Sequence, residues 1–271
     1  MESPPGEHVR RRSLGLLAAA LGGLLLLGLL SACGGGSSGS STPEATATAS
    51  PEPSSLTDLD RYHYVATLSL QASKADGSAN DVAVTTEGDF QKPDRHAFTY
   101  TTQLPGAATK QSAIVIGDKI WIRNGNDPWH EATPGDPQAE RLLGVTFSPI
   151  NPGFLGGPEF RQARDSVRRL PATLEFVNEL RAYHYVVGPA GIDYFRQFLV
   201  QEPITLDLQD MHWDVWLAED GAWPVRLQAT GTVKNDLPIL QELDLEAPTD
   251  WTLRIDISRP NDPALSVQAP Q

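Results

Sequence analysis

The residue whose type and position most clearly indicate chemistry is Cys33, the only cysteine in the chain. It directly follows Leu30-Ser31-Ala32, at the end of an uncharged stretch from Leu14 rich in leucine, alanine and glycine, and Arg10-Arg11-Arg12 precede that stretch. This order is typical of an export signal. A signal peptidase could therefore cut between Ala32 and Cys33. The alternative is an uncleaved anchor helix, because roughly 17 apolar residues can just span a bilayer.

Other residues that commonly do chemistry form no recognisable site. The sequence contains no G-x-S-x-G, P-loop or H-E-x-x-H motif, and its six histidines are scattered. His63 and His184 lie between tyrosines in alternating stretches, a pattern more typical of a sheet face than of metal ligands. His212 and Asp214 would share a strand face, but two candidates do not make a metal site. We therefore predict no catalytic residue, no enzyme activity, no metal and no cofactor.

Carboxylates and tryptophans offer two further alternatives. Asp207 with Asp210, or Glu242 with Asp244 and Glu246, could act as acid and base. In the second group, alternation with leucine favours a solvated strand face instead. Five tryptophans could form a carbohydrate platform, although aromatic residues in strands more often form core or cavity wall. They are Trp129, Trp213, Trp216, Trp223 and Trp251.

The chain is strongly acidic, with a formal net charge of -13. Removing residues 1 to 32 would remove three arginines and two glutamates, a net charge of +1, so the exported chain would carry -14. This charge argues against a nucleic-acid partner and favours repulsion from anionic headgroups. We therefore expect a lipid, not a basic patch, to hold the protein at a membrane. With one cysteine, the folded part has no internal disulfide and depends on its core.

Composition divides the chain into a signal peptide at 1–32, a linker at 33–56 and a single domain at 57–268. The linker is rich in Gly, Ser, Thr and Pro and contains no aromatic residue, so it cannot form a core. Helical spacing predicts helices at 137–143, 158–170 and 191–200. Alternation and turn signals predict strands at 61–72, 81–91, 95–103, 112–116, 119–123, 174–177, 182–187, 204–208, 212–217, 223–233, 239–245 and 251–257.

Several short motifs occur in an order that carries a family resemblance. They are Leu30-Ser31-Ala32-Cys33, which resembles a bacterial lipobox; Gly88-Asp89-Phe90 with Pro93-Asp94; Val115 to Ile122, leading to Trp129; Phe176-Val177-Asn178 before Ala182 to Tyr185; and Asp214 to Leu217, through Asp220-Gly221, to Pro224 to Leu227. Together they resemble the LolA-like superfamily, particularly its actinobacterial and chloroflexal lipoproteins related to LppX and LprG.

The resemblance implies an α+β, mainly β fold. In that fold one large antiparallel sheet curls into an unclosed half-barrel, with helices on its concave face. It also implies a diacylglycerol on the Cys33 thiol, usually with a third acyl chain on the new amine. The sequence departs from the pattern where Asn178-Glu179-Leu180-Arg181 replaces the usual Asn-Gly turn, so the geometry of that hairpin is open.

The leading hypothesis is a lipoprotein on the extracytoplasmic face of the cell membrane that binds a lipid or glycolipid between its sheet and helices, for lipid transfer or envelope maintenance. The alternative is a sensor or scaffold that binds another envelope protein. Phe154 and Leu155 are expected to form a lid. The residues expected to line the cavity are Tyr64, Leu68, Phe98, Ile114, Ile116, Phe160, Phe195 and Trp216.

Overall fold

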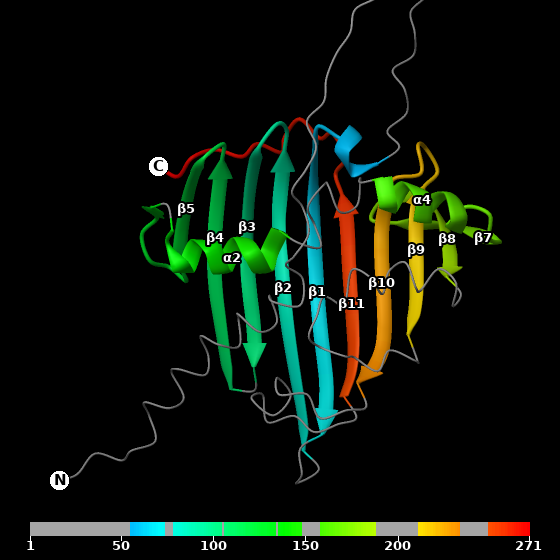
Figure 1. The fold of residues 1–271 in the computed structure, drawn as a ribbon, viewed down its shortest axis with the longest axis horizontal. Coiled ribbons are helices and arrows are strands. Elements are labelled where there is room, and N and C mark those ends of the chain that lie inside the picture. Colours follow the sequence, from blue (N-terminus) through cyan, green and yellow to red (C-terminus); the bar gives the residue numbers. More distant parts are fainter. Residues whose placement is uncertain are drawn as a thin grey trace, which may run out of the picture.

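A computed structural model describes residues 55–73, 78–104, 106–133, 135–147, 158–187, 211–233 and 249–271. These residues form one antiparallel sheet of eleven strands in the order β6-β5-β4-β3-β2-β1-β11-β10-β9-β8-β7 (Figure 1). The sheet does not close, because β6 and β7 are separate edges. The expected fold class, a mainly β protein with one large unclosed antiparallel sheet, is confirmed. The predicted signal peptide, Cys33 and almost all of the predicted linker lie outside the described residues.

Most predicted elements are present with similar bounds. The first half contains the short helix η1 (Leu56–Asp58) and a meander of β1 (Arg61–Ser73), β2 (Ala79–Gln91), β3 (Arg95–Leu104), β4 (Ala107–Ile116), β5 (Lys119–Asn124) and β6 (His130–Glu131). The second half contains α2 (Pro137–Phe147), α4 (Pro158–Val167), β7 (Ala172–Val177), β8 (Leu180–Val187), β9 (His212–Ala218), β10 (Pro224–Val233) and β11 (Thr249–Ser258). The predicted helix at 191–200 and strands at 204–208 and 239–245 lie outside the described residues.

The two halves join through the first and last strands. β11 pairs with β1 in a register that runs from His63 opposite Ser258 to Gln71 opposite Asp250. The chain after β11 then crosses the ends of β1 and β3, where Arg61 donates to the carbonyl of Leu265 and Arg95 to that of Val267. Leu265 and Val267 are buried. The end of the chain therefore closes one end of the core.

The sheet has two unlike faces. On β1, Tyr62, Tyr64, Ala66, Leu68 and Leu70 point to one face, as predicted, and the last four of them pair on β11 with Ile257, Ile255, Leu253 and Trp251 in that order. We call this the apolar face, and α2 and α4 lie over it (Figure 1). Ala139 and Leu142 of α2 and Val167 of α4 belong to the buried core. The opposite face, with His63 on β1 and Asp256 on β11, is called the polar face.

Helix α2 begins where the sequence supplies a cap. The Asp136 carboxylate accepts hydrogen bonds from the backbone N–H groups of Gln138, at 2.8 Å, and Ala139, at 3.3 Å. Pro137 follows as the first helical residue, where its missing N–H costs nothing. The helix lies over the part of the sheet from β5 to β2 (Figure 1), and its Ala139 and Leu142 belong to the buried core.

Two strand glycines lie beneath aromatic rings on the apolar face. Gly88 pairs with Tyr64, and Gly231 pairs with Trp251. A Cβ atom at Gly88 would lie 2.9 Å from the Tyr64 hydroxyl and would clash with the Ala97 carbonyl oxygen, while one at Gly231 would lie 2.8 Å from Trp251 Nε1. Both rings therefore need a neighbour without a side chain.

The hairpin whose geometry the sequence left open is a tight two-residue turn. Asn178 and Glu179 join β7 to β8 with φ of 52° and 65°. Both residues thus lie in the left-handed region, as a type I′ turn requires. Asn tolerates this region, but Glu does not favour it. The Asn178 side chain also donates to the Ile257 carbonyl at 3.1 Å, so the turn crosses β9 and β10 and contacts β11.

We predict that Glu179→Gly stabilises the protein by about 1 kcal/mol, because glycine relieves the left-handed strain. Urea unfolding of the purified protein measures the change. Asp118→Gly is the matched control: Asp118 is also the exposed second residue of a two-residue hairpin turn, but there Gly117 carries the positive φ. The control should be neutral or destabilising by up to about 1 kcal/mol. Equal effects of both substitutions would contradict the strain at Glu179.

Candidate ligand-binding face

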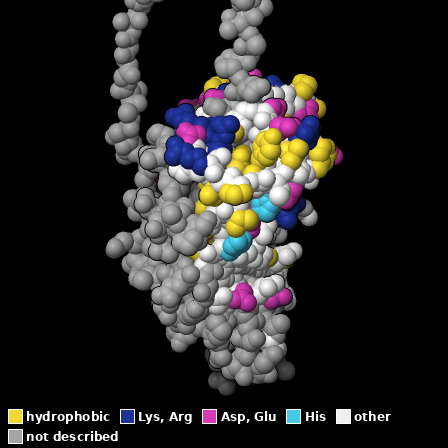
Figure 2. All heavy atoms as spheres, turned by 90° about the vertical axis from the view of Figure 1, so that its right-hand side faces the viewer, with side chains coloured by type: hydrophobic (Ala, Val, Ile, Leu, Met, Phe, Trp, Pro, Cys, Tyr) yellow, Lys and Arg dark blue, Asp and Glu magenta, His cyan; other side chains and the backbone are white. Residues whose placement is uncertain are grey.

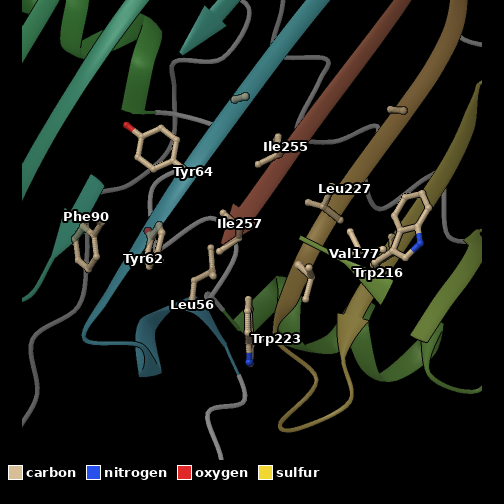
Figure 3. Close-up of a cluster of buried hydrophobic side chains, with 14 of the residues drawn as sticks. Leu56, Tyr62, Tyr64, Phe90, Val177, Trp216, Trp223, Leu227, Ile255 and Ile257 are labelled. Atoms are coloured by element: carbon tan, nitrogen blue, oxygen red, sulfur yellow. The ribbon is translucent and has the colours of Figure 1, made fainter. Parts of the chain in front are cut away.

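The predicted cavity residues divide between the two faces of the sheet. Tyr64, Leu68 and Phe98 lie on the apolar face. Ile114 and Ile116 do not, because Phe98 pairs with Ala113, and alternation turns residues 114 and 116 to the polar face. Trp216 also lies on the polar face, since it pairs with Arg226 across β9 and β10. In Figure 3 it lies at the far side of the buried cluster from Tyr64.

The other predicted site residues are not placed. Phe195 and the proposed lid residues Phe154 and Leu155 lie outside the described residues, as does the side chain of Phe160. Two residues that were not among the eight expected to line the cavity do lie at the centre of the apolar face. They are Leu253 and Trp251 of β11, which pair with Leu68 and Leu70. Only the pairing of β11 with β1, between residues about 190 positions apart, brings them together.

One part of the apolar face is an aromatic cluster. The rings of Tyr62 and Phe90 stack with centroids 5.0 Å apart, and His96 contacts Tyr64 edge-on at 5.4 Å (Figure 3). Burial lowers the pKa of His96 to about 4, a shift that the nearby Asp89 charge only partly opposes. Burial likewise raises the pKa of Tyr64. Both groups are therefore neutral at physiological pH, and the cluster behaves as an apolar surface with a few polar atoms.

Next to this cluster the apolar face is incompletely covered. Leu68 and Leu253 pair across β1 and β11 but are only partly buried, whereas their neighbours Ala66, Ile255 and Trp251 are buried. Two buried donors flank them: the Tyr64 hydroxyl and Trp251 Nε1 have no hydrogen-bond partner among the described residues. A buried donor without a partner costs about 1–3 kcal/mol. This part of the sheet thus combines accessible apolar surface with polar groups able to donate.

The polar face carries a connected hydrogen-bond network on its last strands. His184 contacts Glu175 through Nδ1 at 2.9 Å and Asp214 through Nε2 at 2.8 Å, and its ring stacks on Trp216 with centroids 4.2 Å apart. Trp216 Nε1 donates to Glu175 at 2.8 Å. Hydrogen bonds from Trp216 and then His184 lower the pKa of Glu175. The network joins β7, β8 and β9 side by side.

The predicted sharing of a strand face by His212 and Asp214 is confirmed, with His212 Nε2 3.2 Å from the Asp214 carboxylate. Within the described ranges no group of three or more His, Cys, Asp or Glu side chains could hold a metal ion. Trp213, Trp216, Trp223 and Trp251 are buried. The structure therefore supports the interpretation of these four tryptophans as core residues and not as a carbohydrate platform.

A half-buried carboxylate, that of Asp256, lies where the β7–β8 turn meets β11. Asp256 accepts hydrogen bonds from Arg226 at 2.6 Å, Arg254 at 2.5 Å and Asn178 at 3.0 Å. Burial alone would raise the pKa of Asp256, but the hydrogen bonds from these three donors outweigh it and the net change is downward. The carboxylate therefore holds the hairpin turn to the sheet.

The described residues thus define an open antiparallel sheet with one helix-covered apolar face. No protein-family model matches the chain, and no curated protein matches it significantly. Solved structures similar to it include a DUF1329 family protein from Desulfovibrio piger, 13% identical over 78% of this chain and 89% of that chain, with a TM-score of 0.24. A LolA superfamily protein, NE2245 from Nitrosomonas europaea, is 9% identical over 76% of this chain and 90% of that chain, with a TM-score of 0.22.

The second of these neighbours belongs to the superfamily that the motifs resemble. At these identities and TM-scores the likeness carries no argument about fold or role, and the strand pairings by themselves establish the unclosed sheet. Among the helices in the described part of the chain, none has the length and apolar character to cross a membrane.

Proposed function

We propose that this protein is a lipoprotein, held at the extracytoplasmic face of the cell membrane by lipidated Cys33, that binds a lipid or glycolipid against its apolar face. The observation that carries the proposal is the partly buried pair Leu68 and Leu253 at the centre of a broad apolar sheet. Binding there would shield acyl chains from water during lipid transfer or envelope maintenance.

The chemistry of this surface suits an acyl chain with a polar end. Each methylene moved from water to an apolar surface contributes about 0.8 kcal/mol without directional demands. The Tyr64 hydroxyl and Trp251 Nε1 are donors without described partners. An ester or headgroup oxygen could accept from either, and would remove the cost of leaving the donor unpaired. The proposed contact residues are therefore Tyr64, Leu68, Phe98, Trp251 and Leu253.

We predict that Leu68→Trp lowers bound lipid roughly tenfold or more, because an indole would occupy surface that the ligand would otherwise cover, and the loss of contact with two methylenes at about 0.8 kcal/mol each already corresponds to about tenfold. Lipid extracted from the purified protein is quantified by mass spectrometry against protein. Ser69→Trp is the matched control, since Ser69 is the next residue on β1 but points to the polar face. It should keep its lipid.

A second variant separates blocked binding from misfolding. Leu253→Trp inserts the same ring from the paired strand, and both variants should retain the unfolding midpoint of the parent within a few degrees. Parent protein that carries no lipid, and takes up no labelled lipid, would contradict ligand binding. A stoichiometric envelope protein in that lipid-free sample would instead favour the scaffold alternative.

A further inference from the structure

The apolar face continues onto the edge of the sheet, where its side chains are exposed. Phe176 of β7 is 74% exposed, and Leu170, Leu174 and Tyr183 are exposed to lesser degrees. Leu174 pairs with Tyr183 and Phe176 with Arg181, so Leu174, Phe176 and Tyr183 share the apolar face. We call these four residues the edge patch. Figure 2 shows yellow hydrophobic side chains gathered on this side of the molecule.

A basic group borders the edge patch. The segment 158–170 contains four arginines and two acidic residues, a net charge of +2, in a chain whose net charge is -13. Arg161, Arg168 and Arg169 are exposed, and none of the three forms an ion pair among the described residues. Arg164 is the one that pairs with Asp165, at 2.9 Å. Dark blue side chains gather beside the yellow group in Figure 2.

The edge patch lies at the end of the sheet where the folded chain begins. Ser55 and Leu56 are fully buried, and η1, α4 and the β7–β8 turn lie at the same end (Figure 1). Roughly 20 residues separate Cys33 from this point, and Gly/Ser-rich sequences of that length have an end-to-end distance of about 25 Å. A membrane that holds Cys33 therefore lies within reach of the patch.

We propose that the edge patch and the arginines Arg161, Arg168 and Arg169 dock the domain on an anionic membrane surface. Exposed apolar side chains enter the boundary between headgroups and acyl chains, while arginines contact lipid phosphates. The inference rests on the proposed membrane location and does not require the proposed lipid ligand. The net charge of the chain alone predicts repulsion from anionic headgroups, but a local group of arginines can still bind them.

A second copy of the chain is less suited to this surface. β7 is an edge strand, and an exposed edge can pair with another strand. A symmetric pairing of two β7 strands, however, would bring two sets of arginines together, and like charges would repel. An anionic lipid surface instead supplies the complementary charge. Each arginine near such a surface increases partitioning by about fivefold.

The test uses the full chain, purified from bacterial membranes in detergent and reconstituted into vesicles. An environment-sensitive thiol dye is placed at Phe176→Cys, and, as a control site at the β4–β5 turn, at Asp118→Cys. Vesicles contain phosphatidylcholine alone or mixed with phosphatidylglycerol. We expect a blue shift at position 176 on the mixed vesicles only, reversed by high salt. Combined Arg161→Gln, Arg168→Gln and Arg169→Gln should lower the docked fraction more than tenfold without changing the unfolding midpoint.

Three results would overturn docking: equal emission at position 176 on both vesicle types, an equal shift at position 118, or a shift without vesicles that grows with protein concentration, which would indicate a second copy. Labelling of the parent chain with the same dye tests the anchor separately, because an acylated Cys33 has no free thiol to react. If the parent is labelled, the anchor proposal fails, and the same measurements in a Cys33→Ser background still decide docking.

Discussion

Replacement of Cys33 by serine is expected to abolish acylation of the protein, reducing incorporation of labelled palmitate to background. Cys33 is the only cysteine, so no other thiol can form the thioether. Membrane anchorage should also be lost, because it depends on the acyl chains. A single myristoyl-sized chain binds a membrane only marginally, whereas two or more chains, at about 0.8 kcal/mol per methylene, bind it firmly. Mass spectrometry of the first peptide of the parent should show residue 33 at its start, carrying diacylglycerol.

A shifted cysteine provides the control for Cys33. Cys33→Ser combined with Gly34→Cys keeps one thiol in almost the same place but separates it from the expected cleavage site after Ala32. It should remain unacylated. Labelling of this variant would show that any thiol near the membrane is modified. A parent that retains residues 1 to 32 without acyl mass would instead support the uncleaved anchor helix.

The strands could be predicted because each is a local pattern. The alternation of Tyr62, Tyr64, Ala66, Leu68 and Leu70 is visible in the sequence and matches the buried face of β1. The turn at Gly117-Asp118 likewise carries its own signal, with glycine at the position of positive φ. By contrast, no local feature indicates that β11 pairs with β1, since the partners lie about 190 residues apart.

The candidate site was predicted less well because alternation defines two sides of a strand but not which side the helices cover. On β4 the larger side chains are Ile114 and Ile116, yet Phe98 pairs with Ala113, and the smaller residue faces the core. Trp216 shows the same effect on β9, where both sides are largely buried. Its ring stacks on His184 in the polar network, so its burial does not place it near Tyr64.

The turn at Asn178-Glu179 shows how a weak local signal is supported from a distance. Asn-Glu is a poorer type I′ sequence than Asn-Gly. Asn178 nevertheless contacts Asp256 and Ile257 of β11, and Asp256 is in turn held by two arginines. These contacts lie between residues some 80 positions apart, which is why the sequence left the geometry of this hairpin open.

The apolar face should make the protein sensitive to mild acid through His96. The folded pKa of about 4 lies below the ordinary value of 6.5, so the unfolded chain binds a proton more readily than the folded one. Stability is therefore full above pH 6.5 and falls as the pH drops toward 4. At 1.36 kcal/mol per pKa unit the loss is about 3 kcal/mol. The pKa values of Asp256 and Glu175 are lowered from their ordinary values of 3.8 and 4.5, so these carboxylates affect stability mainly below those pH values. A loss of stability above pH 5 is therefore due mainly to histidine.

Urea unfolding from pH 8 to pH 4.5, compared between the parent and His96→Phe, measures this contribution. Phenylalanine suits the surrounding Tyr64, Phe90 and Phe98 rings and cannot titrate, so the variant should lose much less stability than the parent over this range. His96→Gln, smaller and polar, should flatten the same profile even if its stability at pH 8 is lower. The exposed histidine of β6 supplies the control, since His130→Phe replaces an imidazole with the same phenyl ring without altering the core. A parallel pH profile for parent and His96→Phe would mean that His96 accepts a proton within the folded core, and that water reaches the aromatic cluster of the apolar face.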